Sequence, residues 1–144
     1  MKIRKATKKD IPRCVELSRI KEFKTPILKY PDSKFFNECL DDAYFFVAED
    51  SGEVVGYTIG YKFTKSSAYI DFLTVDKNHR GKGAGKALFD HIRKALKKDG
   101  VKDYFLISPV DAKSNTFYEK LKLKKGKKYL MWCENLLRKR IIER

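Results

Sequence analysis

The sequence is poor in the residues that build metal centres and disulfide frameworks. Its 144 residues include three cysteines and two histidines. The cysteines, Cys14, Cys39 and Cys133, are odd in number and widely spaced, so they predict buried or free thiols and neither a disulfide framework nor a zinc site. His79 and His91 have no further ligand residues at metal-binding spacing. We therefore expect no metal cofactor.

The chain also lacks long apolar runs, internal repeats and low-complexity segments. No uncharged apolar stretch is long enough to span a bilayer, and the basic opening Met1–Lys5 does not start a signal peptide. No linker interrupts the chain, and 144 residues are enough for a single core. These absences predict one soluble, cytoplasmic domain over residues 1–144, with no membrane partner.

The charge balance is strongly positive, with 33 Lys and Arg against 19 Asp and Glu and a formal net charge of +14. Such a surface can attract a polyanionic cofactor, an acidic protein or nucleic acid, but lysine dispersed over the whole chain is also typical of thermophile surfaces. The densest basic clusters are residues 122–128 and 138–140. Because no aromatic-interleaved nucleic-acid motif accompanies them, we do not expect nucleic acid to be the main partner.

Hydrophobic periodicity and turn residues predict an alternating series of strands and helices. Strands are expected at 3–6, 43–49, 54–63, 68–75, 104–108 and 128–136, with one more short strand near 122–125, and helices at 8–20, 33–40, from the glycine-rich loop to about Lys98, and at 114–121. Ser51-Gly52 is a hairpin signal between the second and third strands. This order predicts an α/β (α+β) fold of three layers, in which helices cover both faces of a mixed sheet of about six to seven strands.

The most informative segment is the glycine-rich loop at residues 80–85, R-G-K-G-A-G, between a predicted strand and a predicted helix. The first N–H groups of a helix have no intrahelical partner and carry partial positive charge, and glycine lets a phosphate approach the backbone closely. A P-loop is excluded because Gly85-Lys86 is followed by Ala87. A Rossmann fingerprint is excluded because the glycines stand at 81, 83 and 85, without the surrounding βαβ series.

The pattern R-x-x-G-x-G, preceded by Leu73-x-Val75, resembles the acyl-CoA loop of the GNAT superfamily of N-acetyltransferases. The resemblance extends over nearly the whole chain, through residues 3–10, Gly56-Tyr57 and the F-Y-E-K-L segment at 117–121. Three positions depart from the family pattern. Lys122-Leu123 replaces the usual Gly-Phe, Asp111 stands where the family often has an Asn that contacts the pantetheine arm, and Ser114 replaces a usual Ala.

The resemblance implies acetyl-CoA as acyl donor. The residues that it assigns to cofactor binding are Leu73, Thr74 and Val75 for the pantetheine and thioester, Arg80, Gly81, Lys82, Gly83, Ala84, Gly85 and Lys86 for the pyrophosphate, and Asp111, with Asn115 as a substitute, for the pantetheine arm. It implies that Tyr118 donates a proton or hydrogen bond to the departing sulfur. Asp71, on the strand before the loop, is the candidate base or substrate-positioning group, with a solvated strand carboxylate as the alternative.

The resemblance implies an amine as acceptor, in a direct attack on the thioester through a tetrahedral intermediate. Glu22 and either Asp41 or Asp42 are candidates to line the acceptor cleft, and Phe23, Pro26 and Tyr30 fall in the region that shapes this side in the family. The turn at Gly126 looks short, which would leave the cleft open and slightly favours a peptide or protein amine.

The alternatives are a small-molecule amine or polyamine acetyltransferase, and a non-catalytic CoA-binding regulatory module with a basic face. A homodimer is also left open, since Leu137 and Ile141 lie one helical turn apart in a basic tail.

Overall fold

The computed structural model describes residues 1–24, 30–134 and 136. Its strands are β1 (Lys2–Lys5), β2 (Tyr44–Asp50), β3 (Glu53–Lys62), β4 (Ser67–Val75) and β5 (Asp103–Phe105), and its helices are α1 (Ile11–Leu17), α2 (Ser33–Asp42), α3 (Ala84–Lys98) and α4 (Asn115–Lys120), with short 3-10 turns at Lys8–Asp10, Lys21–Phe23 and Lys77–His79. No helix in these ranges is long and apolar enough to cross a membrane.

The five strands form one sheet in the order β1-β2-β3-β4-β5. The first four strands run antiparallel to their neighbours, and β5 runs parallel to β4 after the crossover through α3. Ser51 and Gly52 both have positive φ (51° and 80°) at the β2–β3 turn, which is the conformation of a tight hairpin turn. The mixed sheet is therefore confirmed.

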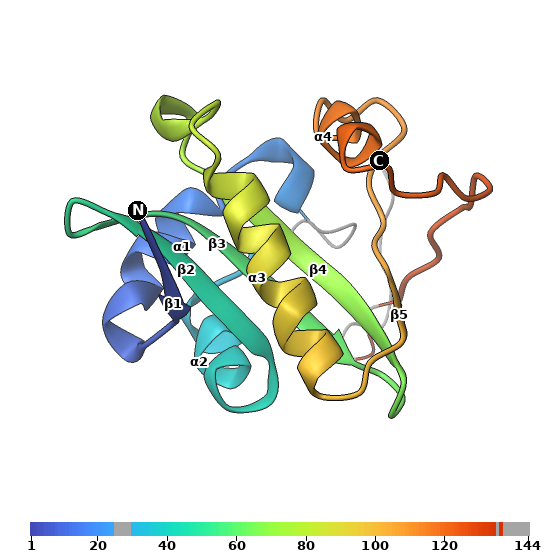
Figure 1. The fold of residues 1–144 in the computed structure, drawn as a ribbon, viewed down its shortest axis with the longest axis horizontal. Coiled ribbons are helices and arrows are strands. Elements are labelled where there is room, and N and C mark those ends of the chain that lie inside the picture. Colours follow the sequence, from blue (N-terminus) through green and yellow to red (C-terminus); the bar gives the residue numbers. More distant parts are fainter. Residues whose placement is uncertain (25–29, 135, 137–144) are drawn as a thin grey trace.

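Successive side chains of a strand point to opposite faces of the sheet, and here both faces carry buried apolar side chains. Helices cover each face (Figure 1). One core joins α1 and α2 to the sheet through residues such as Cys14, Phe36 and Tyr57. The other joins α3 to the opposite face through Leu88, Phe89, Ile92 and Leu96, which recur at helical spacing and are at most 1% exposed. The predicted three-layer arrangement is confirmed.

The expected six to seven strands are too many for the part of the chain that the structure describes, where the sheet has five. Within the described residues, neither 122–125 nor 128–134 forms a strand, although Tyr129, Leu130 and Trp132 have high strand propensity. These three side chains are 82%, 79% and 86% exposed. Strand propensity reflects how well a side chain fits a paired, half-buried surface, and this segment pairs with no strand in the described part of the chain.

The predicted helix over 8–20 is divided. Residues Lys8–Asp10 form a 3-10 turn, and the α-helix proper begins at Ile11, with Pro12 in its first turn. Asp10 is fixed at this junction because its carboxylate accepts the Thr7 N–H (2.8 Å) and pairs with Arg4 (2.8 Å). The helix ends at Leu17, ahead of the buried Ser18, whose hydroxyl meets the Tyr57 hydroxyl at 2.6 Å.

Candidate active site

The strands β4 and β5 pair at only three positions and then separate. The three residues of β4 with partners on β5 are Ser67, Ala68 and Tyr69, at the start of the strand. In contrast, β4 remains paired to β3 as far as Val75. Figure 1 shows the two segments diverging from one end, with α4 beyond the open end. The outer backbone edge of Leu73–Val75 therefore has no strand partner among the described residues, and it can accept an extended chain of amide groups as an added strand would.

A β-bulge in β4 places Asp71 beside this opening. Ile59 is opposite Phe72 and Gly60 is opposite Ile70, so Asp71 is the extra residue that faces no partner on β3. A bulge bends the strand and redirects a side chain. Glycine suits position 60, because a Cβ there would lie 2.9 Å from Ile92 Cδ1 and 3.1 Å from the Tyr69 carbonyl oxygen, so these neighbours would have to shift.

The Asp71 carboxyl is half-buried, and burial raises its pKa from 3.8 to about 6, partly offset by a hydrogen bond from the Tyr69 hydroxyl. Burial and the neighbouring Asp71 in turn raise the pKa of Tyr69 to about 12, so the Tyr69 phenol stays protonated as a donor. At neutral pH, Asp71 is mostly ionised and yet more basic than an ordinary aspartate. These are the properties of a general base.

The glycine-rich loop forms an open helix start. Gly81 and Gly83 have φ of 77° and 87°, and Gly83 is the N-cap of α3, with no side chain to cap the helix. The first hydrogen bond of the helix runs from the Ala87 N–H to the carbonyl oxygen of the N-cap residue, Gly83 (2.9 Å). The N–H groups of Ala84, Gly85 and Lys86 therefore face outward at the positive end of a 15-residue helix, which suits a pyrophosphate.

The basic side chains of the loop make their own contacts. Arg80 Nε donates to the Val75 carbonyl oxygen (3.1 Å), and Lys86 pairs with Asp90 (2.6 Å) one turn along α3. Lys82 is exposed. The backbone is therefore the best-organised anion-binding part of the loop, and the three cations add charge around it.

The approach to the loop is anchored by contacts that the sequence did not reveal. The Asp76 N–H donates to the Val55 carbonyl oxygen (2.7 Å), and the Asp76 carboxylate receives Arg13 Nη2 (3.1 Å). Arg13 Nε also donates to the Val54 carbonyl oxygen (3.0 Å). These residues are too far apart in sequence for a local pattern to signal the link.

Tyr118 lies on α4, which packs on the first half of α3. At Gly85 the Phe117 ring lies close to the helix backbone, at van der Waals distance (3.6 Å) from where a Cβ would be. The Phe89 ring is 6.1 Å from that of Phe117 and 6.0 Å from that of Tyr118. Burial raises the pKa of Tyr118, and its hydroxyl is near enough to Tyr69 to affect the pKa of that residue. The fold thus brings Asp71, Tyr69 and Tyr118 to one region.

The two candidates for the pantetheine arm differ. Asp111 is exposed. Asn115 is engaged in its own turn, because its amide nitrogen donates to the carbonyl oxygens of Pro109 (2.9 Å) and Val110 (3.2 Å) and its oxygen accepts from the Ser108 hydroxyl. The contact of either residue with the pantetheine arm stays a prediction.

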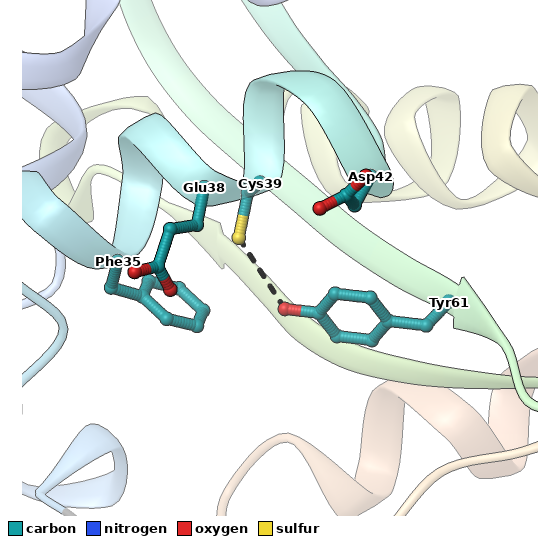
Figure 2. Close-up of a pocket in the computed structure, with 5 residues that line it drawn as sticks. All are labelled: Phe35, Glu38, Cys39, Asp42 and Tyr61. Atoms are coloured by element: carbon teal, nitrogen blue, oxygen red, sulfur yellow. Dashed lines mark hydrogen bonds between the residues drawn. The ribbon is translucent and has the colours of Figure 1, made fainter.

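On the α2 side of the sheet there is a hollow of about 200 Å³, lined by Phe35, Glu38, Cys39, Asp42 and Tyr61 (Figure 2). Either Asp41 or Asp42 was predicted to line the acceptor cleft, and of these two Asp42 lines the hollow. The other four lining residues were missed. The lining residues that α2 contributes are spaced i, i+3, i+4 and i+7, and this spacing could have indicated that they share one face of a helix. Nothing local in the sequence indicates that Tyr61 joins them, because that depends on how α2 packs on β3.

The remaining acceptor-side predictions have mixed outcomes. The Phe23 ring packs into the core, 4.9 Å from that of Phe72, and Tyr30 is exposed. Pro26, the Glu22 side chain, residues 138–140 of the basic tail, Leu137 and Ile141 lie outside the described part of the chain.

A mixed sheet whose fourth and fifth strands separate beside a glycine-capped helix defines a class of protein, the acyltransferases that use an acyl-CoA donor. The chain belongs to the acetyltransferase (GNAT) family, whose model matches residues 13–122. The family's acyl donor is acetyl-CoA, and the separated strands and open helix start of this chain fit that donor.

Similar proteins agree with this assignment. An uncharacterized N-acetyltransferase of Methanocaldococcus jannaschii is 38% identical over 94 residues, which are 61% of this chain and 54% of that protein. The chain thus matches about half the length of this relative. A metagenomic soil aminoglycoside acetyltransferase in complex with sisomicin is 26% identical, covers 94% of this chain and 95% of its own, and has a TM-score of 0.72. A Mycobacterium tuberculosis protein in complex with CoA has the same fold, at 21% identity and a TM-score of 0.69, covering 83% of this chain and 70% of its own.

Proposed function

We propose that this protein transfers the acetyl group of acetyl-CoA to a primary amine by direct attack through a tetrahedral intermediate. The observation that carries the proposal is a bulge aspartate of raised pKa, beside the unpaired edge of β4, whose neighbour Tyr69 is also close to the protonated Tyr118. Together Asp71 and Tyr118 supply the base and the acid of an aminolysis.

The chain's backbone would hold the donor. The outer edge of Leu73–Val75 pairs with the pantetheine amides, and the N–H groups at the start of α3 receive the pyrophosphate. A backbone N–H of the β4 edge then lies at the thioester carbonyl and stabilises the oxyanion. Arg80, Lys82 and Lys86 raise the local positive potential.

The acceptor must lose a proton before it can attack. A lysine-type amine has a pKa near 10.4, so reaching its neutral form at pH 7 costs about 4.6 kcal/mol, against about 1 kcal/mol for an α-amine. Asp71 takes this proton from the ammonium group. The free amine attacks the carbonyl carbon, a C–N bond forms, and the carbonyl electron pair moves onto oxygen.

Collapse of the intermediate breaks the C–S bond. The nitrogen loses its second proton to water, and the sulfur leaves as a thiolate, which takes a proton from Tyr118. Tyr118 then recovers a proton from the solvent, and Asp71 gives up to the solvent the proton that it took. Because thiols have a pKa of about 8.5, protonation of the sulfur is a modest part of the barrier. The products are the acetylated amine and CoA, with one net proton released.

The acceptor we propose is a lysine-type amine, on a peptide, a protein or a small molecule. Residues 124–134, which follow α4 and its last packed side chains, are exposed and do not form a roof over the hollow. An open site of this kind admits an amine on a larger molecule.

The experiment that tests the function follows thiol release from acetyl-CoA in the presence of pooled amines and peptides. We expect release that depends on an amine and is strongly reduced in Asp71→Asn. If Asp71 is the base, the loss of kcat/KM is greater for a substrate with only a side-chain amine than for one with only an N-terminal amine. Equal losses would leave Asp71 a positioning role. CoA binding without release from any amine would make the protein a non-catalytic CoA-binding module.

A further inference from the structure

Asp76 lies at the point where β4 ends and the chain turns toward the glycine-rich loop. Its backbone N–H donates to the Val55 carbonyl oxygen (2.7 Å). Its carboxylate caps the 3-10 turn at Lys77–His79, where one oxygen accepts the Asn78 N–H (3.4 Å) and the other lies 3.2 Å from His79 Nδ1. The Asp76 side chain therefore sets the path of the chain from the strand to the loop.

The segment after Asp76 has little apolar packing to hold it. No side chain within residues 77–83 is buried, and residues 80–83 are all exposed. Figure 1 shows this yellow-green segment projecting beyond the end of the sheet before it enters α3. At Gly81 and Gly83 a Cβ would meet no atom within 4 Å. A segment without buried apolar contacts opens at a low free energy, so its position depends on polar contacts such as those of Asp76.

Arg13 of α1 supplies a contact from outside this segment. Its Nη2 lies 3.1 Å from the Asp76 carboxylate, and its Nε donates to the Val54 carbonyl oxygen (3.0 Å). Glu16 and Glu53 lie at 3.1 and 3.4 Å from the same guanidinium. The side chains of Arg13 and Asp76 are 23% and 18% exposed, so the pair is partly shielded from solvent. The planar guanidinium thus ties the end of β4 to the start of β3 and to α1.

The pair joins the two sides of the sheet. The core on one face contains α1, whereas α3, whose first N–H groups would receive the pyrophosphate, packs on the other face. A donor that binds a loop already held in place loses less conformational entropy on binding. If the loop were released, affinity would fall in proportion to the fraction of molecules in the binding conformation. The contact between Arg13 and Asp76 should therefore act on donor affinity.

We propose that Arg13 and Asp76 are positioning residues for the acyl donor. Together they hold residues 76–83 in the conformation that places the N–H groups of α3 at the pyrophosphate. This inference rests on the proposed acetyl transfer and adds the residues that set its donor affinity. Loss of the pair should raise the KM for acetyl-CoA and the Kd for CoA together, and kcat at saturating donor should not change.

The first experiment measures CoA affinity by calorimetry, together with steady-state kinetics, in Arg13→Ala, Arg13→Lys and Asp76→Asn. In Arg13→Ala and Asp76→Asn we expect Kd and KM to rise by about 5–20-fold, between the effects of an exposed and a buried charged contact. Arg13→Lys should be intermediate, because an ammonium can pair with Asp76 but lacks the fork that also reaches the Val54 carbonyl oxygen. Because both residues act through one contact, the double variant should bind no more weakly than the weaker single variant. Arg19→Ala, at an exposed position beyond the end of α1, is the control for the loss of one positive charge.

The second experiment measures the position of the loop without any activity. Lys77, Arg80 and Lys82 are trypsin sites within the segment, and mass spectrometry locates cleavage at them. Under native conditions, cleavage there should be several-fold faster in Arg13→Ala than in Arg19→Ala. Saturating CoA should restore the protection, because it binds the closed conformation of the loop.

The two proposals fail in different ways. No thiol release from any amine in the wild type would overturn the acetyl transfer, and calorimetry and proteolysis with CoA would still test the pair. Unchanged CoA affinity and unchanged cleavage in the loop, with a lower free energy of unfolding, would show that Arg13 and Asp76 are only structural. A fall in kcat at unchanged CoA affinity would also overturn the positioning role.

Discussion

At the scale of single residues, the proposed chemistry depends on two groups held in unfavourable surroundings. Burial raises the pKa of Asp71 to about 6 and raises that of Tyr118 above its usual value. A group whose charged form is disfavoured in the folded state lowers stability wherever it is charged. Such groups are typical of active sites, where reactivity is favoured over stability.

Replacing Asp71 by Asn should therefore stabilise the protein while it reduces activity. The folded-state pKa of about 6 lies above the ordinary aspartate value of 3.8, so the folded state holds the proton more tightly and the charge costs free energy above about pH 6. The free energy of unfolding should rise by about 1–3 kcal/mol at pH 7 to 8, and the gain should fade as the pH falls toward 4. Urea unfolding at several pH values measures this. A gain that does not change with pH would contradict the assigned cause.

The same group sets the pH dependence of catalysis. In the wild type, kcat/KM for a lysine-type amine should rise as the pH increases through about 6, because Asp71 must be ionised to accept a proton. The rise should be absent from the residual activity of Asp71→Asn. A wild-type profile that is flat between pH 5 and 7 would argue against Asp71 as base.

Removing the Tyr118 hydroxyl should lower kcat by about 10–100-fold, the smaller end of general-acid effects, because a thiolate is a tolerable leaving group. In Tyr118→Phe the KM for acetyl-CoA should change little. Tyr44→Phe is the control, since that hydroxyl bonds Asp99 (2.6 Å) at the far end of α3. Wild-type kcat in Tyr118→Phe across the pH range would show that the hydroxyl is only structural.

At the scale of elements, the site is built where regular structure stops. The bulge in β4, the separation of β4 from β5 and the glycine start of α3 each leave backbone groups or a side chain without the partner that a regular element would supply. The elements themselves are held by contacts such as the Arg13–Asp76 ion pair and the packing of the Phe117 ring of α4 on the Phe89 ring of α3. Rigid elements thus present open positions to the substrates.

Gly83→Asn should separate the binding role of the loop from its conformation. Asparagine tolerates the left-handed region better than other non-glycine residues, and no atom lies within 4 Å of a Cβ at this position, so the fold should survive. The new side chain stands at the start of α3, where the pyrophosphate would approach, and CoA affinity should fall at least about 10-fold. Calorimetric titration with CoA measures this.

Gly52→Asn is the matched control. Gly52 has φ of 80° and equally open surroundings, but it lies in the β2–β3 turn. Both variants should show the same small change in stability, and only Gly83→Asn should lose affinity. Equal CoA affinity in the two variants would show that the loop does not bind the phosphates.

At the scale of the whole molecule, the charge is strongly positive overall and locally negative at the hollow beside α2. The chain carries a formal net charge of +14, which suits a donor with a pyrophosphate and a further phosphate. The hollow beside α2, lined by Glu38 and Asp42, is a local acidic exception.

Salt should act on the donor through this overall charge. The KM for acetyl-CoA should rise several-fold between about 50 and 500 mM NaCl, because screening shortens the Debye length from more than 10 Å to a few ångströms. The value of kcat at saturating substrates should change little, since the chemistry takes place in a partly enclosed site. Steady-state kinetics over the salt series test this, and a KM that does not respond to salt would show that the net charge plays no part in binding the donor.

Sequence patterns were most reliable where one local rule decides the structure. The helix after the glycine loop was predicted to about Lys98, and it runs over Ala84–Lys98, because periodic apolar residues and a closing Gly100 are local signals. Residues 128–134, the described part of the predicted strand 128–136, do not form a strand, because their pattern supplies propensity and not a partner. The helix over 8–20 was predicted whole, whereas the contacts of Asp10 with Arg4 and Thr7 and a proline at position 12 set where the α-helix begins.

The sequence alone determined the glycine loop, the order of the elements and the presence of Tyr118 and Asp71 in a recognisable family pattern, since each is a matter of residue type and near spacing. Only the tertiary structure decided that Asp71 is the extra residue of a bulge, that its burial raises its pKa, and that Tyr61 of β3 faces Glu38 and Asp42 of α2. The physical reason is that strand register and helix docking are fixed by contacts between segments far apart in the chain. Burial and the approach of charges, which control the chemistry of the site, exist only after those contacts have formed.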